Sequence, residues 1–177
     1  MSRVPSDAQY EINAGPHRAT IVEVGGGIRD YTHDGQPILH GYPPDQMCRG
    51  ARGTPLIPWP NRLADGASTF EGASTFEVTE HQLPLNEPDT RTAIHSLTHW
   101  RNWELRDNAD DQLTLGLVPH PQPGYPFILH LTIDYHLREH GLTVTTTATN
   151  FGSQRCPYAR GQHPYPTVTA RWGIEPD

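Results

Sequence analysis

Proline and glycine recur so often along this chain that they leave little room for a long helix. The 177 residues contain 18 prolines and 16 glycines. Proline lacks a backbone hydrogen-bond donor and glycine weakens helices, so both residues favour short segments joined by turns. Three prolines fall within Thr54–Pro60, where they exclude a helix interior and a central strand. This pattern favours an architecture of many short strands.

Apolar residues that alternate with polar ones predict strands with one buried face. Leu113, Leu115 and Leu117 alternate in this way, and Phe127–Leu137 keeps the same period of two. The Thr-rich run Leu142–Asn150 has strong β propensity. We find no convincing amphipathic helix. The sequence therefore predicts an all-β fold, an antiparallel β-sandwich, in a single domain over residues 1-177.

The first part of the chain predicts a hairpin. The β-branched run His17–Val24 is broken by three glycines, and Ile28–Tyr31 is expected to return as the second arm. Asp34-Gly35 is a signal for a type I′ turn, which continues the chain toward Leu39.

A five-residue repeat predicts a second hairpin. Ala67–Glu71 recurs as Ala73–Glu77, separated by Gly72. Two copies are too few for a solenoid, so we expect two hairpin arms with Phe70 and Phe76 on the buried face.

Charge and composition exclude several classes of function. The formal net charge is −7 and the basic residues form no stripe, so we expect no nucleic acid partner. No apolar run reaches the length of a membrane span, and Met1–Ala14 lacks a signal pattern. Cys48 and Cys156 lie far apart and predict neither a zinc site nor a disulfide. A reducing, cytoplasmic location is the default expectation.

Four short motifs carry residue types that serve in catalysis or binding: Asn61-Arg62, Ile94-His95-Ser96, Asn150-Phe151-Gly152 and Gly161-Gln162-His163-Pro164-Tyr165. Each lies in a loop or at the end of a predicted strand, where a rigid scaffold presents side chains. Pro164 pushes His163 into an extended conformation. An imidazole held in this way suits acid–base chemistry, because its unperturbed pKa lies near neutrality.

In order and spacing, these motifs resemble those of the aldose 1-epimerases, the galactose mutarotase family. The residues that carry the resemblance are Pro58-Trp59-Pro60-Asn61-Arg62, Gly66–Gly72, Ile94-His95-Ser96, Gly124-Tyr125-Pro126-Phe127, Asn150-Phe151-Gly152 and Gly161-Gln162-His163-Pro164-Tyr165. The resemblance extends over about residues 21-168, and the tail 169-177 diverges from the family.

The resemblance implies a galactose mutarotase-like supersandwich and an isomerase that interconverts α and β anomers of free aldoses, its monosaccharide substrates. By this match, His163 is the acid that protonates the ring oxygen, and His95 binds and polarises the same region. Arg62 donates hydrogen bonds to sugar hydroxyls, a task that suits its planar guanidinium. Asn61 and Tyr165 complete the substrate-binding set, with Asn61 expected to shape the loop. No metal ion or organic cofactor is implied.

The departures from the family pattern concern the end of the chain. The family's general base is a glutamate near the end of a longer chain, and a substrate-binding aspartate precedes it. Neither position has a counterpart here, so the sandwich is expected to be incomplete at the C-terminus. Glu175 could be offered as a substitute base, but its spacing gives no support. Ser96 stands where the family usually has glycine, which could narrow the backbone approach beside His95.

Three alternatives to an active isomerase therefore stay open. The chain could be a carbohydrate-binding remnant without turnover, or a truncated, inactive gene product. It could also self-associate through unpaired strand edges, so that two short chains together close the sheets.

Histidine spacing and the tryptophans have other interpretations. His95 and His99, like His136 and His140, have the spacing of two metal ligands on a helix face. Both pairs fall in predicted strands, where residues four apart are roughly 13 Å apart, so no metal site is predicted. Trp103 is expected in the core, whereas the role of Trp59 is open between packing and sugar stacking.

Overall fold

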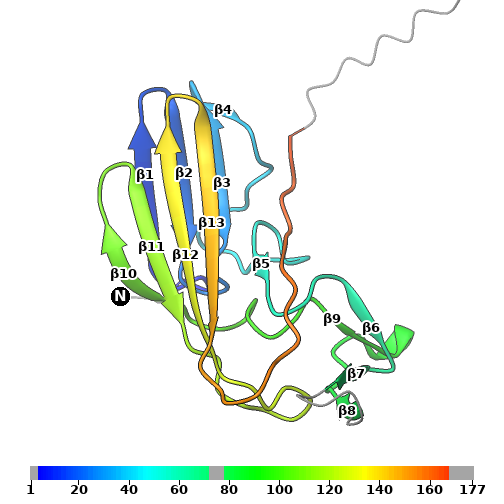
Figure 1. Ribbon diagram of the computed structural model, residues 1–177. Helices are drawn as coiled ribbons and strands as arrows, with labels where there is room; N and C mark the ends of the chain where they lie inside the picture. The colour runs from blue at the N-terminus through cyan, green and yellow to red at the C-terminus, as the bar shows by residue number, and fades with distance from the viewer. Residues whose placement is uncertain (1–3, 72–77, 168–177) are drawn as a thin grey trace, which may run out of the picture.

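The structure, a computed structural model, describes residues 4–71 and 78–167 (Figure 1). Its regular structure in these residues is β, apart from the short 3-10 helix η1 (Pro88–Thr90). The first sheet contains β1 (Gln9–Ala14), β2 (His17–Val22), β3 (Ile28–His33) and β4 (Gln36–Pro37), in that order. The second contains β10 (Glu104–Asn108), β11 (Gln112–Leu117), β12 (Leu129–Arg138) and β13 (Gly141–Asn150). All pairings within both sheets are antiparallel.

Three two-stranded sheets extend from these layers. They pair β5 (Pro55–Leu56) with β14 (Gly161–Gln162), β6 (Arg62–Ala64) with β9 (Thr92–Ile94), and β7 (Ala67–Glu71) with β8 (Val78–Gln82). Figure 1 shows the two large sheets together and places β6 to β9 beyond their lower end. Among the residues that the structure describes, no helix is long and apolar enough to cross a membrane.

The hydrophobic core lies between the two large sheets. β1 and β2 of the first sheet contact β11 and β12 of the second. Residues of β12 alternate between buried Leu129, Leu131, Ile133, Tyr135 and Leu137 and more exposed polar residues. Burying each leucine or isoleucine contributes about 1.5–3 kcal/mol, so this single face is a large part of the driving force for folding. The predicted all-β antiparallel sandwich is thus confirmed.

A loop of the first layer joins this core through Trp103. The indole of Trp103 is fully buried, and a Cβ atom on Gly26 would lie 3.0 Å from it. The carbonyl of the same Gly26 accepts a hydrogen bond from the hydroxyl of Tyr135 on β12. Trp103 is therefore a core residue, as predicted, and the glycine run allows the loop to approach the second sheet closely.

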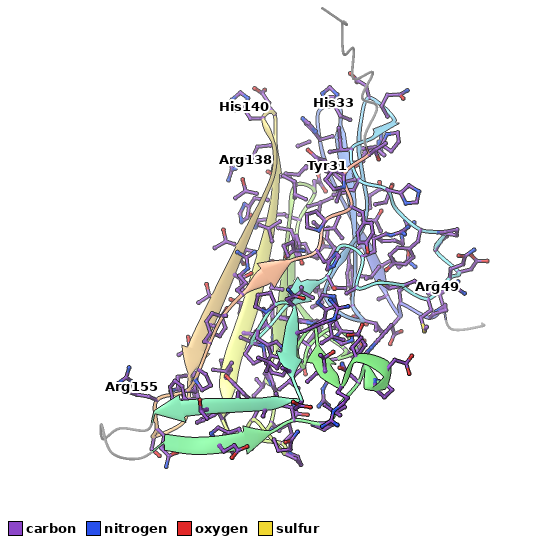
Figure 2. The ribbon with its side chains drawn as sticks, turned by 90° about the vertical axis from the view of Figure 1, so that its right-hand side faces the viewer. Tyr31, His33, Arg49, Arg138, His140 and Arg155 are labelled. Carbon is purple, nitrogen blue, oxygen red and sulfur yellow. The ribbon has the colours of Figure 1, made fainter. Side chains whose placement is uncertain are left out.

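The predicted turns are largely confirmed. β2 pairs with β3, and the turn to β4 has positive φ at both Asp34 (50°) and Gly35 (72°), as a type I′ turn requires. The turn between β12 and β13, marked by His140, lies at the same end of the sandwich as His33 at the end of β3 (Figure 2).

Three local features differ from the sequence predictions. β1 lies in an N-terminal segment for which no strand is predicted. The strand that pairs with β7 is β8, which is not predicted from the sequence, and the second copy of the repeat, residues 73–77, lies outside the described residues. The segment between His95 and His99 is a series of turns, not a strand, because a left-handed backbone at His95 ends β9.

Candidate active site

His163 directly follows the short strand β14, and its backbone is fixed on both sides. The N–H of His163 donates to the carbonyl of Thr54 at 3.1 Å, and the carbonyl of His163 accepts from the N–H of Gly53 at 2.8 Å. A Cβ atom at Gly161 would lie 2.7 Å from Cβ of Pro60. Only glycine therefore allows β14 to lie this close to the Pro-rich loop, which is the segment Thr54–Pro60. The sequence prediction of a stiff backbone around His163 agrees with this pairing.

His95 follows β9 in the left-handed region, with φ of 56°. Its N–H donates to the carbonyl of Asn61 at 2.9 Å, and its carbonyl lies 2.9 Å from Nδ1 of His99. Ser96 has φ of 72°, and its Oγ accepts a hydrogen bond from the N–H of Ile57 at 2.8 Å. Ser96 therefore ties the loop that carries His95 to the Pro-rich loop Thr54–Pro60.

The two histidines meet although they lie far apart in the sequence. Their ring centroids are 5.0 Å apart and their planes are nearly perpendicular, at 89°. Tyr165 also stacks on His163, with ring centroids 5.1 Å apart and an angle of 20° between the planes. The fold thus brings the rings of His95 and Tyr165 into contact with that of His163.

The surroundings of His95 favour its neutral form. Burial lowers the pKa of His95, and the nearby His163, His99 and Arg62 lower it further, while Glu87 acts in the opposite direction. In the described part of the chain, Nδ1 of His95 is buried without a hydrogen-bond partner. A neutral imidazole is the form of histidine that can accept a proton.

Arg62 begins β6, beside β9, and its guanidinium is held by Glu87. Nε of Arg62 donates to Oε2 of Glu87 at 2.6 Å, and Nη2 donates to Oε1 at 2.8 Å. Glu87 also accepts hydrogen bonds from the hydroxyls of Thr90 and Thr92, both at 2.7 Å. These contacts, led by Arg62, hold the pKa of the Glu87 carboxyl well below its usual range. Two N–H groups of the Arg62 guanidinium, at Nε and Nη2, are therefore already bound to a carboxylate.

Asn61 contributes through its backbone. Its φ is 59°, a left-handed value that asparagine tolerates better than most residues. Its carbonyl accepts the N–H of His95, so Asn61 orients the histidine loop. Nη1 of Arg62 lies 3.5 Å from Oδ1 of Asn61, at the limit of a hydrogen bond.

Tyr165 is anchored away from the histidines by its hydroxyl. The hydroxyl donates to the carbonyl of Gly50 at 3.2 Å, and the guanidinium of Arg52 lies 4.8 Å from the ring centroid. With these contacts Tyr165 supports the ring of His163 and presents its face, not its hydroxyl, to the site.

Comparison with known proteins decides the family. The family described as aldose 1-epimerase matches residues 8–174. The chain belongs to the aldose 1-epimerase family. An uncharacterized Escherichia coli protein, YihR, is 39% identical over 163 residues, which is 92% of this chain and 51% of YihR.

Solved structures of this epimerase fold agree with the architecture. A GalM/aldose epimerase homologue from C. elegans superimposes with a TM-score of 0.74 at 18% identity, over 92% of this chain and 51% of that one. A galactose 1-epimerase from Lactobacillus acidophilus gives a TM-score of 0.72 at 21% identity, over 94% and 51%. The chain thus spans about half the length of the relatives it matches.

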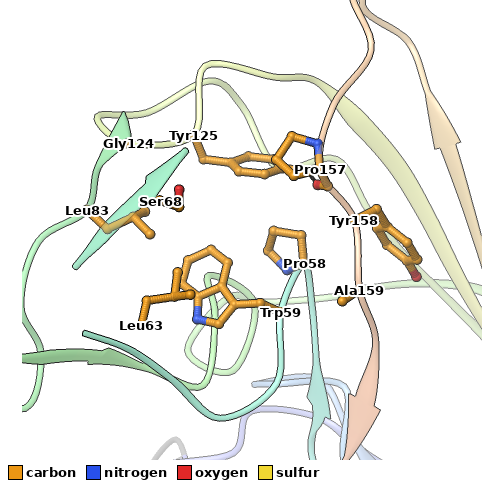
Figure 3. Close-up of a pocket in the computed structure, with 10 residues that line it drawn as sticks. All are labelled: Pro58, Trp59, Leu63, Ser68, Leu83, Gly124, Tyr125, Pro157, Tyr158 and Ala159. Carbon is orange, nitrogen blue, oxygen red and sulfur yellow. Dashed lines mark hydrogen bonds between the residues drawn. The ribbon is translucent and has the colours of Figure 1, made fainter. Parts of the chain in front are cut away.

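An apolar pocket lies between the Pro-rich loop and the segment that leads to β14 in this epimerase-family chain (Figure 3). Its volume is about 190 Å³, and its lining is Pro58, Trp59, Leu63, Ser68, Leu83, Gly124, Tyr125, Pro157, Tyr158 and Ala159. The hydroxyl of Tyr125 donates to the carbonyl of Pro157 at 2.8 Å, which joins the Gly-Tyr-Pro loop to this segment. Trp59 thus lines this pocket, and His95 and His163 are not among its lining residues.

Two further residues near the epimerase motifs are not predicted from the sequence. Glu87 engages Arg62, and Asn86 pairs with Ile94 through both its side-chain oxygen (2.7 Å) and nitrogen (2.9 Å). Both residues lie in a polar loop whose composition does not distinguish them from other surface residues. Their contacts with Arg62 and Ile94 become visible only in the structure, where the loop lies beside β9. Across residues 4–71 and 78–167, no three His, Cys, Asp or Glu side chains gather in a metal-binding arrangement.

Proposed function

We propose that this chain interconverts the α and β anomers of a free aldose by acid–base opening and closing of the sugar ring. The observation that carries the proposal is the contact between His95 and His163, whose ring centroids lie 5.0 Å apart. Membership of the aldose 1-epimerase family supports the reaction type.

Each proton in this reaction has a candidate group. His163 donates a proton to the ring oxygen as the bond from the anomeric carbon to that oxygen breaks. A base removes the proton of the anomeric hydroxyl, and a carbonyl forms. Rotation about the bond next to the carbonyl and closure by the reverse steps give the other anomer. General acid–base catalysis of this kind typically contributes 10²–10⁴-fold to a rate.

We infer that His95 is the base in this chain. Glu87 is the carboxylate whose charge acts on His95, but its engagement with Arg62 and its lowered pKa make it a weak base. His95, by contrast, is kept in its neutral, proton-accepting form by burial and by the nearby His163, His99 and Arg62. Arg62 and Glu87 together offer N–H donors and carboxylate acceptors to sugar hydroxyls.

A second candidate function is sugar binding without turnover. The observation that favours it is the ion pair between Arg62 and Glu87. Its remaining N–H groups and carboxylate oxygens can bind sugar hydroxyls without moving a proton. Binding would then survive where catalysis does not.

The test is polarimetry of freshly dissolved α-D-glucose or α-D-galactose. Purified chain is compared with His163→Ala and with a control, His140→Ala, whose exposed side chain lies in the β12–β13 turn. The proposal predicts that the wild type and the control exceed the buffer rate and that His163→Ala does not. If all three match the buffer while sugar still raises the melting temperature of the wild type, the chain binds without turnover. If sugar has neither effect, both functions are wrong for this chain.

A further inference from the structure

The outer edge of β13 lies open. β13 is the last strand of the second sheet and pairs along its whole length with β12. On the other side of β13, the described residues supply no neighbouring strand, and no backbone hydrogen bond leads from Thr143–Thr149 to another segment. At one end the hydroxyl of Tyr31 contacts the N–H of Leu142. The free edge therefore begins at Thr143.

The other outer strands of the two large sheets carry features that discourage pairing with another chain. β10 is charged and contains a register shift between Leu105 and Asp107. β4 has only two residues, one of which is Pro37. On β1, the N–H of Asn13 already donates to the carbonyl of Asp110 at 2.6 Å. Charge, irregularity, proline and short length all protect strand edges, and β13 has none of them.

β13 is ten residues long and contains neither proline nor a charged residue. Its outward face presents threonine at every position, namely Thr143, Thr145, Thr147 and Thr149, and all four are exposed. Its inward face carries Leu142, Val144, Thr146 and Ala148, which are only half-buried. Their neighbours on β12, by contrast, are buried almost completely. The sandwich therefore covers the inner face of β12 almost completely, but that of β13 only in part.

We propose that β13 pairs antiparallel with β13 of a second copy of this chain, about a twofold axis at Thr146. Side chains that face each other across an antiparallel pair lie on the same side of the sheet. With the axis at Thr146, Thr145 faces Thr147 of the second copy on the outside. On the inside, Val144 faces Ala148 of the second copy. The two four-stranded sheets become one continuous sheet of eight strands.

The sequence of β13 favours its own copy as the occupant. Because every outward position is threonine, each outward pair across the axis joins two threonines, a favourable cross-strand pair. A charged strand would oppose like charges when paired with itself, and this uncharged strand avoids that repulsion although the chain carries −7. A twofold contact of this kind closes on itself and leaves no further free edge on β13.

Sedimentation of the purified chain at increasing concentration tests the proposal. We expect the wild type to form a dimer, and Thr145→Lys/Thr147→Lys to raise its dissociation constant roughly tenfold or more, because two lysine pairs would face each other across the axis. Both threonines are exposed, so thermal melts of this variant are expected to match those of the wild type at concentrations low enough for both proteins to be monomeric. The matched control, Gln112→Lys/Thr132→Lys, adds the same charges to the same face on β11 and β12 and is expected to remain dimeric.

Hydrogen exchange gives a second measurement on the unmodified chain. Amides within Thr143–Thr149 are expected to exchange more slowly as the wild-type concentration rises, and not in the double-lysine variant of β13. A wild type that stays monomeric at all concentrations overturns the proposal, as does a dimer that the β13 variant leaves intact. Equal weakening by the control variant overturns it too, since the contact would then lie elsewhere. The proposal is independent of catalysis, because the histidine pair takes no part in it.

Discussion

At the scale of single residues, the histidine pair depends on a backbone that is held in an unfavourable conformation. His95 and Ser96 both lie in the left-handed region, with φ of 56° and 72°. This region costs a non-glycine residue roughly 1–2 kcal/mol. The conformation persists because the carbonyl of Asn61 holds the N–H of His95, and Oγ of Ser96 holds the N–H of Ile57.

Two substitutions at Ser96 separate the hydrogen bond from the backbone strain. Ser96→Ala keeps the strain and leaves the buried N–H of Ile57 without its partner, which costs about 1–3 kcal/mol. Ser96→Gly loses the same hydrogen bond but removes the strain. We therefore expect chemical denaturation to show Ser96→Ala less stable than Ser96→Gly by about 1 kcal/mol. Equal stability of the two variants would contradict the role given to the left-handed backbone.

The lowered pKa values of His95 and His99 predict a pH dependence of stability. Burial is the largest cause for both residues. An unfolded histidine binds a proton near its ordinary pKa of about 6.5, whereas these folded histidines stay neutral to lower pH. The unfolded state thus binds more protons below about pH 6.5, so stability is full above this value and is lost as pH falls through the lowered pKa values.

Thermal melts between about pH 7.5 and about pH 5.5 measure this effect. We expect the melting temperature of the wild type to fall with pH, and that of His99→Gln to fall less steeply. Glu87, whose pKa is also lowered, acts in a separate and more acidic window. Identical slopes for the wild type and His99→Gln would show that the histidine does not titrate as described.

The sequence identifies the candidate site residues more readily than their partners. His95, Arg62 and His163 lie in motifs with distinctive neighbours, so a resemblance can identify them. Glu87 lies in a loop without such a motif, and it becomes a partner of Arg62 only because η1 and β9 place it there. The ion pair of Arg62 with Glu87 therefore follows from the fold and cannot be read from the sequence motif around Arg62.

At the scale of elements, the sequence predicts the strands in which apolar and polar residues alternate, because this alternation gives a strand one buried face. β11, β12 and β13 each follow a period of two and appear where the pattern places them. β14 consists of two residues, which are too few for a period. The pairing of β14 with β5 depends on the close approach of Gly161 to Pro60. The local sequence does not predict this contact between distant parts of the chain.

Gly161→Ala tests whether this approach positions His163. The added Cβ would meet Pro60 at 2.7 Å, and forcing an extra carbon into a packed contact costs about 1–3 kcal/mol. We expect urea denaturation to show this loss. At Gly152 the nearest atom to a new Cβ is Oδ1 of Asn150 at 3.3 Å, so Gly152→Ala is the control, with a change of about 0.5 kcal/mol or less. If Gly161→Ala leaves the free energy of unfolding unchanged, β14 has room to shift away from Pro60.

At the scale of the whole molecule, the two large sheets are stabilised by one shared core. Ile133 on β12 is fully buried between them, whereas its neighbour Thr132 points to the other face of the sheet. We expect Ile133→Ala to lower the free energy of unfolding by about 2–5 kcal/mol, because it leaves a cavity between the layers. Thr132→Ala is expected to change it by only about 0.5 kcal/mol. A small effect of Ile133→Ala would mean that the layers fold separately.

The proposed function is the exchange of sugar anomers by the histidine pair, His95 and His163. Magnetisation exchange between the anomeric protons of α- and β-D-galactose at equilibrium measures this step directly. We predict that wild-type protein and His140→Ala accelerate the exchange above that in buffer, and that His163→Ala and His95→Asn do not. Exchange no faster than in buffer with the wild type, or an equal rate with His163→Ala, would contradict the claim.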